Sequence, residues 1–206
     1  MKNRILAVLA AFTSTLALAQ QPAPVAFEKI PAGHIRAEGW LKTQLDYQVS
    51  GLSGNLDRMW DDVGPNSGWL GGTGESWERG PYYLRGIVSL AYVTQNGAML
   101  AKIKPWLEAI LASQNAEGYF GPKNDEDWWP RWLVAQLLIT HHESTGDARV
   151  VPFLKKYYAY ELAHLTAKPL KSWAKARGGE DLASILWLHR KTADPRLLDL
   201  ARLVDS

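Results

Sequence analysis

The chain has 206 residues, no cysteine, and 23 basic against 21 acidic side chains. This near-neutral balance argues against nucleic acids or a charged membrane surface as partners, because both require a basic surface. The lack of cysteine excludes disulfides, thiolate metal ligands and a thiol nucleophile from this chain.

Residues 1–19 have the pattern of a secretory signal peptide. Lys2 and Arg4 precede an apolar run, and small residues end the segment before Gln20. The segment is too short to span a bilayer stably, so we expect an exported protein, periplasmic or extracellular, with no membrane attachment after cleavage. A membrane anchor is the alternative. Removal of the segment leaves the chain formally neutral.

The next segments precede the main body of the fold. Residues 20–33 carry three prolines among small and polar side chains, which predicts an extended linker. In residues 34–49 apolar side chains recur at near-helical spacing and predict a first amphipathic helix. Residues 51–74 are rich in glycine, asparagine, serine and aspartate, so we expect a long surface loop there. Loops of that length in compact domains tend to be functional.

A repeat follows. Three segments that begin at Ile87, Leu137 and Ile185 share one layout, which is an almost entirely apolar helix, a short polar turn and a helix with one apolar stripe. A period of about 50 residues is typical of helix pairs arranged as an array or a toroid. We therefore predict an all-α fold of helical hairpins in residues 34–206. The apolar helix of each pair is expected to lie inside and the striped helix outside.

The segments that lead into the inner helices carry the unusual chemistry. They are residues 71–81, 112–132 and 175–181, and each brings acidic side chains close to the start of an inner helix. We expect three loops on one rim of the array, the rim being the end at which the inner helices begin. Tryptophan beside carboxylates and arginines in a neutral exported protein indicates a carbohydrate site. The rings expected to stack on sugar are Trp69, Trp77, Trp128 and Trp129, with packing of loops onto helix ends as the alternative.

The acids of the rim provide catalytic candidates, because glycoside hydrolysis uses a pair of carboxyl groups or one carboxyl group and another nucleophile. Glu78 lies inside a Trp-Glu-Arg-Gly cluster, and Glu180 follows two glycines that allow close backbone approach. These two are the predicted catalytic residues. Helix capping and local ion pairs are the alternatives for all rim charges. The further candidates for substrate contact are Glu75, Arg79, Asp127, Arg131 and Arg177.

Five sequence blocks carry a resemblance to a known family. GESWERGPYYLRG, LASQNAEGYFGP, DWWPRW, TGDARV and RGGEDLASILWLHRKTADPRLLDLA occur in this order. Together they resemble the secreted proteins of the β-L-arabinofuranosidase-like glycoside hydrolase superfamily, glycoside hydrolase family 127 and its relatives. The resemblance implies an (α/α)6 toroid with a sugar site at one mouth. Six hairpins need roughly 300 residues, so we expect about half of a toroid, an N-terminal fragment or truncated product that is itself inactive.

The resemblance also bears on cofactors. Enzymes of this type are thought to use a cysteine nucleophile near a zinc ion that further cysteines and a glutamate hold. It therefore implies zinc in a full-length relative, but no cofactor or metal and no nucleophile in this segment. Two other functions stay open: an α/α-toroid polysaccharide lyase, with Tyr82 or Tyr83 as the base and Arg79 neutralising a uronate, and a glycan-binding remnant without catalysis.

Overall fold

The computed structural model describes residues 22–206, and the predicted signal peptide at residues 1–19 lies outside this range. Within it the chain is helical and contains no β-strand, so the predicted all-α class is confirmed. No helix of residues 22–206 is long and apolar enough to cross a membrane. The α-helices are α1 (Gly39–Ser50), α2 (Leu52–Asn55), α3 (Arg79–Thr94), α4 (Gly97–Ala112), α5 (Trp129–Thr145), α6 (Val150–His164), α7 (Ser172–Thr192) and α8 (Arg196–Asp205).

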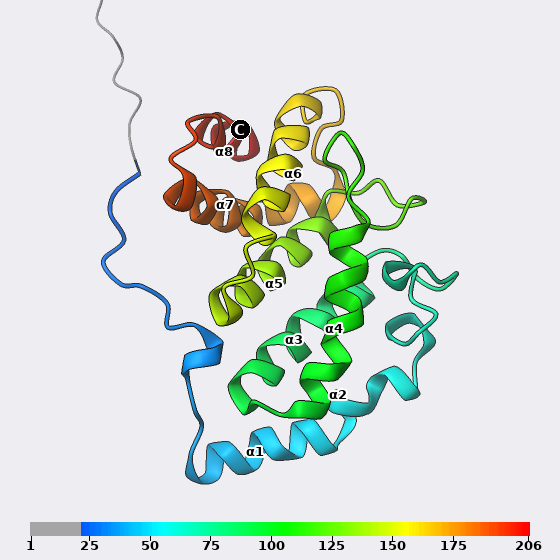
Figure 1. The fold of residues 1–206 in the computed structure, drawn as a ribbon. Helices are drawn as coiled ribbons and strands as arrows, with labels where there is room; N and C mark the ends of the chain where they lie inside the picture. Colours follow the sequence, from blue (N-terminus) through cyan, green and yellow to red (C-terminus); the bar gives the residue numbers. More distant parts are fainter. Residues whose placement is uncertain (1–21) are drawn as a thin grey trace, which may run out of the picture.

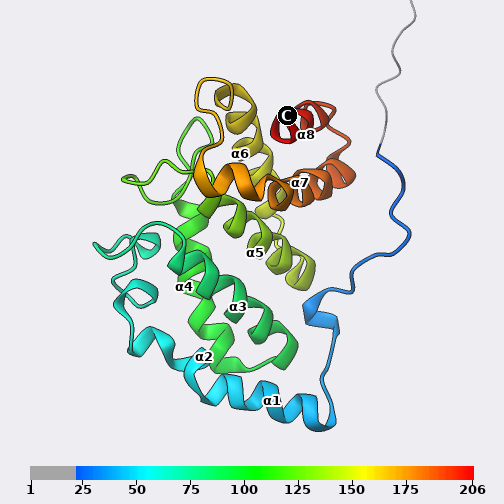
Figure 2. The ribbon, with the colours of Figure 1, turned by 180° about the vertical axis from the view of Figure 1, so that it is seen from behind.

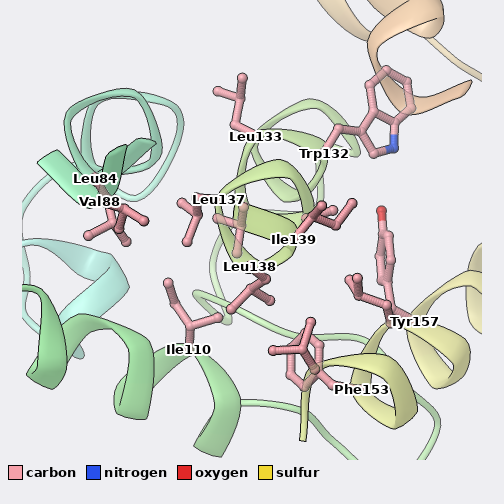
Figure 3. Packing of buried hydrophobic residues seen from close by; sticks show 14 of the residues in the cluster. Leu84, Val88, Ile110, Trp132, Leu133, Leu137, Leu138, Ile139, Phe153 and Tyr157 are labelled. Atoms are coloured by element: carbon pink, nitrogen blue, oxygen red, sulfur yellow. The ribbon is translucent and has the colours of Figure 1, made fainter. Parts of the chain in front are cut away.

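Three helical hairpins make up the main body, α3–α4, α5–α6 and α7–α8 (Figure 1). Helix α5 packs against both α3 and α7, and each of these inner helices also contacts its hairpin partner. Side chains of α5 are buried on nearly all sides, as expected of a helix sandwiched between others. Figure 3 shows Leu133, Leu137 and Leu138 of α5 surrounded by apolar side chains of α3, α4 and α6. The predicted hairpins, with α5 as an inner helix, are confirmed.

The turns of the hairpins explain where the helices end. Gln95, Gly146 and Ala193 take left-handed backbone conformations, with φ of 52°, 73° and 53°, directly after α3, α5 and α7. This conformation is the usual way for a chain to leave a helix. The side chain of Asn96 then accepts the backbone N–H of Met99 (3.0 Å) and caps the start of α4. The short polar turns predicted from the sequence are therefore the hairpin turns.

The N-terminal part differs from its prediction in detail. Residues 35–38 are extended and α1 begins only at Gly39, after a single 3-10 turn, η1 (Ala32–His34). The backbone N–H of Gly33 donates to Ser144 Oγ (3.2 Å) and anchors this turn beside the end of α5. Helix α1 lies across one end of the hairpins and contacts α3 (Figure 2). Leu45 and Val49 of α1 pack against the core, whereas Trp40 is 77% exposed.

Residues 51–74, predicted as a long surface loop, fold into single turns instead. They form α2 and the 3-10 turns η2 (Leu56–Arg58), η3 (Asp61–Val63) and η4 (Gly68–Leu70). The chain doubles back on itself because Asn66 O accepts the backbone N–H of Gly74 (2.8 Å). A Cβ atom at Gly72 would lie 2.2 Å from the same oxygen, so only glycine fits this close approach. Val63 and Trp69 are consequently buried rather than at the surface.

Candidate functional site

The ends at which α3 and α5 begin are joined by side-chain hydrogen bonds. Trp77 Nε1 donates to Asp127 Oδ2 (2.9 Å), and Trp129 Nε1 donates to Glu78 Oε2 (2.7 Å). Each pair links the segment before one inner helix to the segment before the next. The structure therefore brings four of the predicted site residues together on one rim.

The third predicted rim loop is wrong, because residues 175–181 are helical. Helix α7 begins at Ser172, so Gly178 and Gly179 lie inside it despite the usual cost of glycine in a helix. A Cβ atom at Gly178 would lie 3.3 Å from a methyl group of Val204, which shows how closely α7 and α8 approach there. Glu180 consequently extends from the third turn of a helix and not from a loop.

Glu180 nevertheless lies close to the other rim residues. Its carboxylate accepts a hydrogen bond from Arg177 Nη1 (2.9 Å) one turn earlier and from Arg85 Nη1 of α3 (3.5 Å). Its backbone oxygen accepts Gln136 Nε2 of α5 (3.1 Å). All three inner helices thus meet at Glu180, and two arginines orient its side chain.

Tyr82 is at the centre of these groups and is 40% exposed. Its ring meets the ring of Trp129 edge to face at 6.1 Å. The Arg177 guanidinium lies 5.4 Å from the centre of the Trp129 ring and 5.7 Å from that of Trp173. We call the following residues the Tyr82 cluster: Glu78, Tyr82, Arg85, Trp129, Trp173, Arg177 and Glu180.

The electrostatics of the cluster favour a protonated tyrosine. Burial raises the pKa of Tyr82, and the nearby charges of Glu180 and Glu78 raise it further. Arg177 and Arg85 lower the pKa, but the net shift is upward. The Tyr82 hydroxyl therefore remains a hydrogen-bond donor at neutral pH, beside two carboxylates that accept and two arginines that donate.

Sequence reasoning missed Arg85 and Trp173 and considered Tyr82 only as a lyase base. A helical periodicity would have found them. Arg85 lies three residues after Tyr82 on α3, and Trp173 lies four residues before Arg177 on α7, so each pair shares a helix face. For α7 this signal depends on knowing that the helix already includes residues 172–181.

Glu75 and Arg79, two of the predicted substrate contacts, are engaged in contacts within the protein at the start of α3. The two carboxylate oxygens of Glu75 accept the backbone N–H groups of Glu78 (3.0 Å) and Arg79 (3.2 Å). The side chain of Arg79 pairs with Asp62 and lies over the ring of Trp60. Burial raises the pKa of Glu75, against the opposing effect of the two backbone N–H donors. These contacts hold the start of α3, and with it Glu78, in place.

Substitution of Glu75 by alanine is expected to lower the free energy of unfolding by about 1 kcal/mol, because two N–H groups of the first helical turn lose their acceptor. Urea unfolding followed by circular dichroism measures the change. Glu75→Gln retains one acceptor oxygen and should lose less than Glu75→Ala. Equal stability of Glu75→Ala and the unaltered protein would show that the carboxylate does not act as a cap.

Arg131 organises the second rim loop and is completely buried. Its five N–H groups all donate within this loop, to Asp125 Oδ2 and to the backbone oxygens of Phe120, Pro122, Asp125 and Asp127, at 2.7 to 3.3 Å. The guanidinium also lies 4.1 Å from the centre of the Tyr119 ring. Of the two roles the sequence left open, pairing with neighbouring acids is the one seen, and no donor remains for a ligand.

The four predicted stacking rings differ in exposure. Trp69, Trp128 and Trp129 are at most 4% exposed, and Trp77 is half-buried. Their indole N–H groups all donate inside the protein, that of Trp69 to Trp77 O and that of Trp128 to Lys168 O, each at 2.9 Å. This burial favours the alternative role, packing of loops onto helix ends. The accessible ring on the rim beside Tyr82 is Trp173, which is 49% exposed.

The zinc site implied by the resemblance does not fit the residues of this chain. The chain has no cysteine, and residues 22–206 contain no group of three or more His, Asp or Glu side chains placed to hold a metal ion. Asp127 and Glu78 are occupied by indole donors, and Glu75 by backbone donors. No chemical step is therefore assigned to a metal here.

Comparison with protein families gives a match over most of the chain. Residues 16–206 match the family described as beta-L-arabinofuranosidase, GH127 catalytic domain. The match includes all three hairpins and every residue of the Tyr82 cluster. Neither the curated proteins nor the solved structures gave a match.

Proposed function

The chain belongs to the family of GH127 β-L-arabinofuranosidase catalytic domains. We propose that it belongs to an exported glycoside hydrolase and that the sugar substrate contacts the Tyr82 cluster. Membership of this family implies a carbohydrate substrate. The proposed ligand is the family's namesake, a terminal β-L-arabinofuranosyl group. Export is proposed from the signal-peptide pattern of residues 1–19, and N-terminal sequencing of the secreted product tests it: an intact N-terminus would contradict cleavage.

The convergence of polar groups around Tyr82 carries this proposal. A sugar offers hydroxyl groups that both donate and accept, together with apolar ring faces. Carboxylates of Glu78 and Glu180 can accept these hydroxyls, while Arg85 and Arg177 can donate to them. The half-exposed ring of Trp173 is available for an apolar sugar face. These groups come from α3, from the residue directly before it, and from α7.

Within the cluster the two carboxylates have different surroundings. Glu78 Oε2 is held by the buried indole of Trp129, which leaves Oε1 for a ligand. Glu180 is oriented by Arg177 and Arg85. Both remain candidates for proton transfer to or from the substrate. The thiol nucleophile of the resembling enzymes has no counterpart in this chain, which contains no cysteine.

The lyase alternative is less well supported. Abstraction of a proton by tyrosine requires a lowered pKa, whereas burial raises the pKa of Tyr82 and raises that of Tyr83 to about 12. Tyr83 donates instead to Asp57 Oδ1 (3.4 Å). Arg79, the cation expected to neutralise a uronate, is paired with Asp62.

Titration calorimetry with methyl β-L-arabinofuranoside tests the proposal. Glu180→Gln is expected to weaken binding about tenfold or more, because a charged acceptor is worth about 1.5–3 kcal/mol. Tyr82→Phe should weaken it by a smaller factor. Glu117→Gln, an exposed acid outside the cluster, is the matched control and should leave the dissociation constant unchanged. Binding that is equal in all variants would place the sugar elsewhere, and binding without any hydrolysis would fit the glycan-binding alternative.

A further inference from the structure

Two carboxyl groups are buried directly below the rim. Glu161 of α6 and Asp181 of α7 have no exposed surface, and each lies within hydrogen-bonding reach of the other. Neither forms a salt bridge with any cation of residues 22–206. Asp181 directly follows Glu180, so this pair lies under the helix turn that presents the Tyr82 cluster.

One oxygen of each carboxyl group has a donor. Trp132 Nε1 donates to Glu161 Oε1 (3.0 Å), and Tyr158 Oη donates to Asp181 Oδ1 (3.1 Å). Glu161 Oε2 and Asp181 Oδ2 are buried without a hydrogen-bond partner. Figure 3 shows the hydroxyl of Tyr157 directed at the indole of Trp132, which is the donor to Glu161.

Two ionised carboxylates at this position would be very costly. Each charge would lose its hydration in a low-dielectric interior, and the two would repel each other. A single proton removes the repulsion and one of the two buried charges, because one carboxyl group can then donate to the unpartnered oxygen of the other. Aspartic proteases show this chemistry, in which two neighbouring carboxyl groups hold one proton between them.

We propose that Glu161 and Asp181 share one proton in the folded protein, and that the resulting hydrogen bond between α6 and α7 positions Arg177 and Glu180 on the rim. The two acids act as positioning residues and touch no ligand. That Arg177 and Glu180 meet a sugar rests on the proposed function. The shared proton does not depend on it.

The charged groups around the pair, among residues 22–206, form their salt bridges with other partners and none with Glu161 or Asp181. From α6, the hydroxyls of Tyr157 and Tyr158 face the pair, and both tyrosines have pKa values well above the ordinary value because of burial. From α5 come the indole of Trp132 and the guanidinium of Arg131, whose donors are fully used in the second rim loop. Ser184 of α7 is a further neighbour. The hollow beside Tyr158 is lined by Lys155 of α6, by Asp194 and by Arg196 at the start of α8, and the last two pair with each other.

The sign of the pH dependence follows from burial, which raises the pKa of both carboxyl groups. In the unfolded chain these groups lose their protons near the ordinary carboxyl pKa, while the folded protein keeps one proton to higher pH. The folded state therefore binds more protons in this range, so stability falls as pH rises toward the folded pKa. In Glu161→Gln the amide donates to Asp181 at every pH, and this loss disappears.

Infrared spectroscopy and urea unfolding from about pH 5 to about pH 8 test the shared proton on the complete chain. The unaltered protein should show the carbonyl stretch of a protonated carboxyl group at neutral pH, and Glu161→Gln and Asp181→Asn should each lack it. The equilibrium constant for unfolding of the unaltered protein should rise with pH relative to that of Glu161→Gln. The rise should be about tenfold for each unit by which the pKa of the carboxyl pair lies above the ordinary carboxyl value. Glu117→Gln, which removes an exposed acid, should behave as the unaltered protein in both measurements.

Three results would overturn the proposal. One is a neutral-pH spectrum without the protonated carboxyl band, and another is an equal pH dependence in the unaltered protein and Glu161→Gln. The third is stabilisation of the unaltered protein, but not of Glu161→Gln, by added Ca²⁺, because a cation would then take the place of the proton.

The positioning role has its own readout. In Asp181→Ala, hydrogen exchange should accelerate in residues 175–184 of α7 while α3 stays protected, and Glu161→Gln should keep the protection of both. Uniform acceleration in all helices, or none in α7, would contradict it. These measurements involve no sugar, so their failure is distinct from a failure of the proposed function.

Discussion

Arg131→Met is expected to destabilise the protein by about 3–5 kcal/mol, the cost typical of removing one partner of a buried ion pair. The substitution leaves Asp125 without its cation and removes the Arg131 donor from four backbone oxygens of residues 120–127, of which that of Asp125 keeps the Tyr119 hydroxyl as a donor. Buried acceptors that lose their partner pay the full cost of desolvation. Urea unfolding followed by circular dichroism measures the loss, and Arg131→Lys should recover only part of it because an ammonium group cannot reproduce the planar fork.

The control for Arg131 is an exposed arginine. Arg202 of α8 pairs with Asp199 (2.9 Å) at the surface, and such pairs contribute at most about 1 kcal/mol. Arg202→Met should therefore change stability little. A comparable loss in the two variants would contradict the account of Arg131 as the organiser of the second rim loop.

Trp129→Ala should cost a similar amount, about 3–5 kcal/mol, since it empties a large buried volume at the junction of α3, α5 and α7. The ring lies against Tyr82, Trp132 and Arg177. Trp129→Phe retains most of the apolar volume but removes the donor to Glu78, so about 1–3 kcal/mol is expected. In both variants Glu78 loses its fixed orientation, and sugar affinity should fall with stability.

Trp173→Ala separates packing from binding. This ring is half-exposed at the start of α7, so its removal should leave the unfolding midpoint nearly unchanged while weakening sugar binding. Thermal unfolding and titration calorimetry on the same samples measure both effects. A large loss of stability in Trp173→Ala would contradict the binding role assigned to Trp173. No loss of stability in Trp129→Ala would contradict the packing role assigned to Trp129.

Much of the fold could be predicted from the sequence, because the hairpins repeat and their turns carry recognisable residues. The inner position of α5 follows from a helix that is apolar on nearly all sides. The beginning of α7 could not be predicted in the same way. Gly178 and Gly179 indicate a break in the helix, yet the close approach of Val204 of α8 favours a small residue at position 178 inside it. Packing between helices overrides the local preference there.

The site could be predicted in part. The meeting of Glu78 with Trp129 follows from the spacing of the two rim loops, but the exposure of each ring does not, because tryptophan serves packing and binding equally well. Glu180 and Asp181 are adjacent acids in the sequence. On a helix, neighbouring side chains point about 100° apart, so one reaches the rim and the other the interior. Only the extent of α7 reveals that difference.

A crystal structure of the chain with methyl β-L-arabinofuranoside tests the central claim most directly. We expect the sugar within hydrogen-bonding distance of Tyr82 and Glu180, with Arg177 donating to a hydroxyl group and Trp173 beside the ring. A sugar bound only between Tyr119, Tyr160 and Lys168, which line a separate pocket of the rim loops, would contradict the claim that the Tyr82 cluster is the binding site.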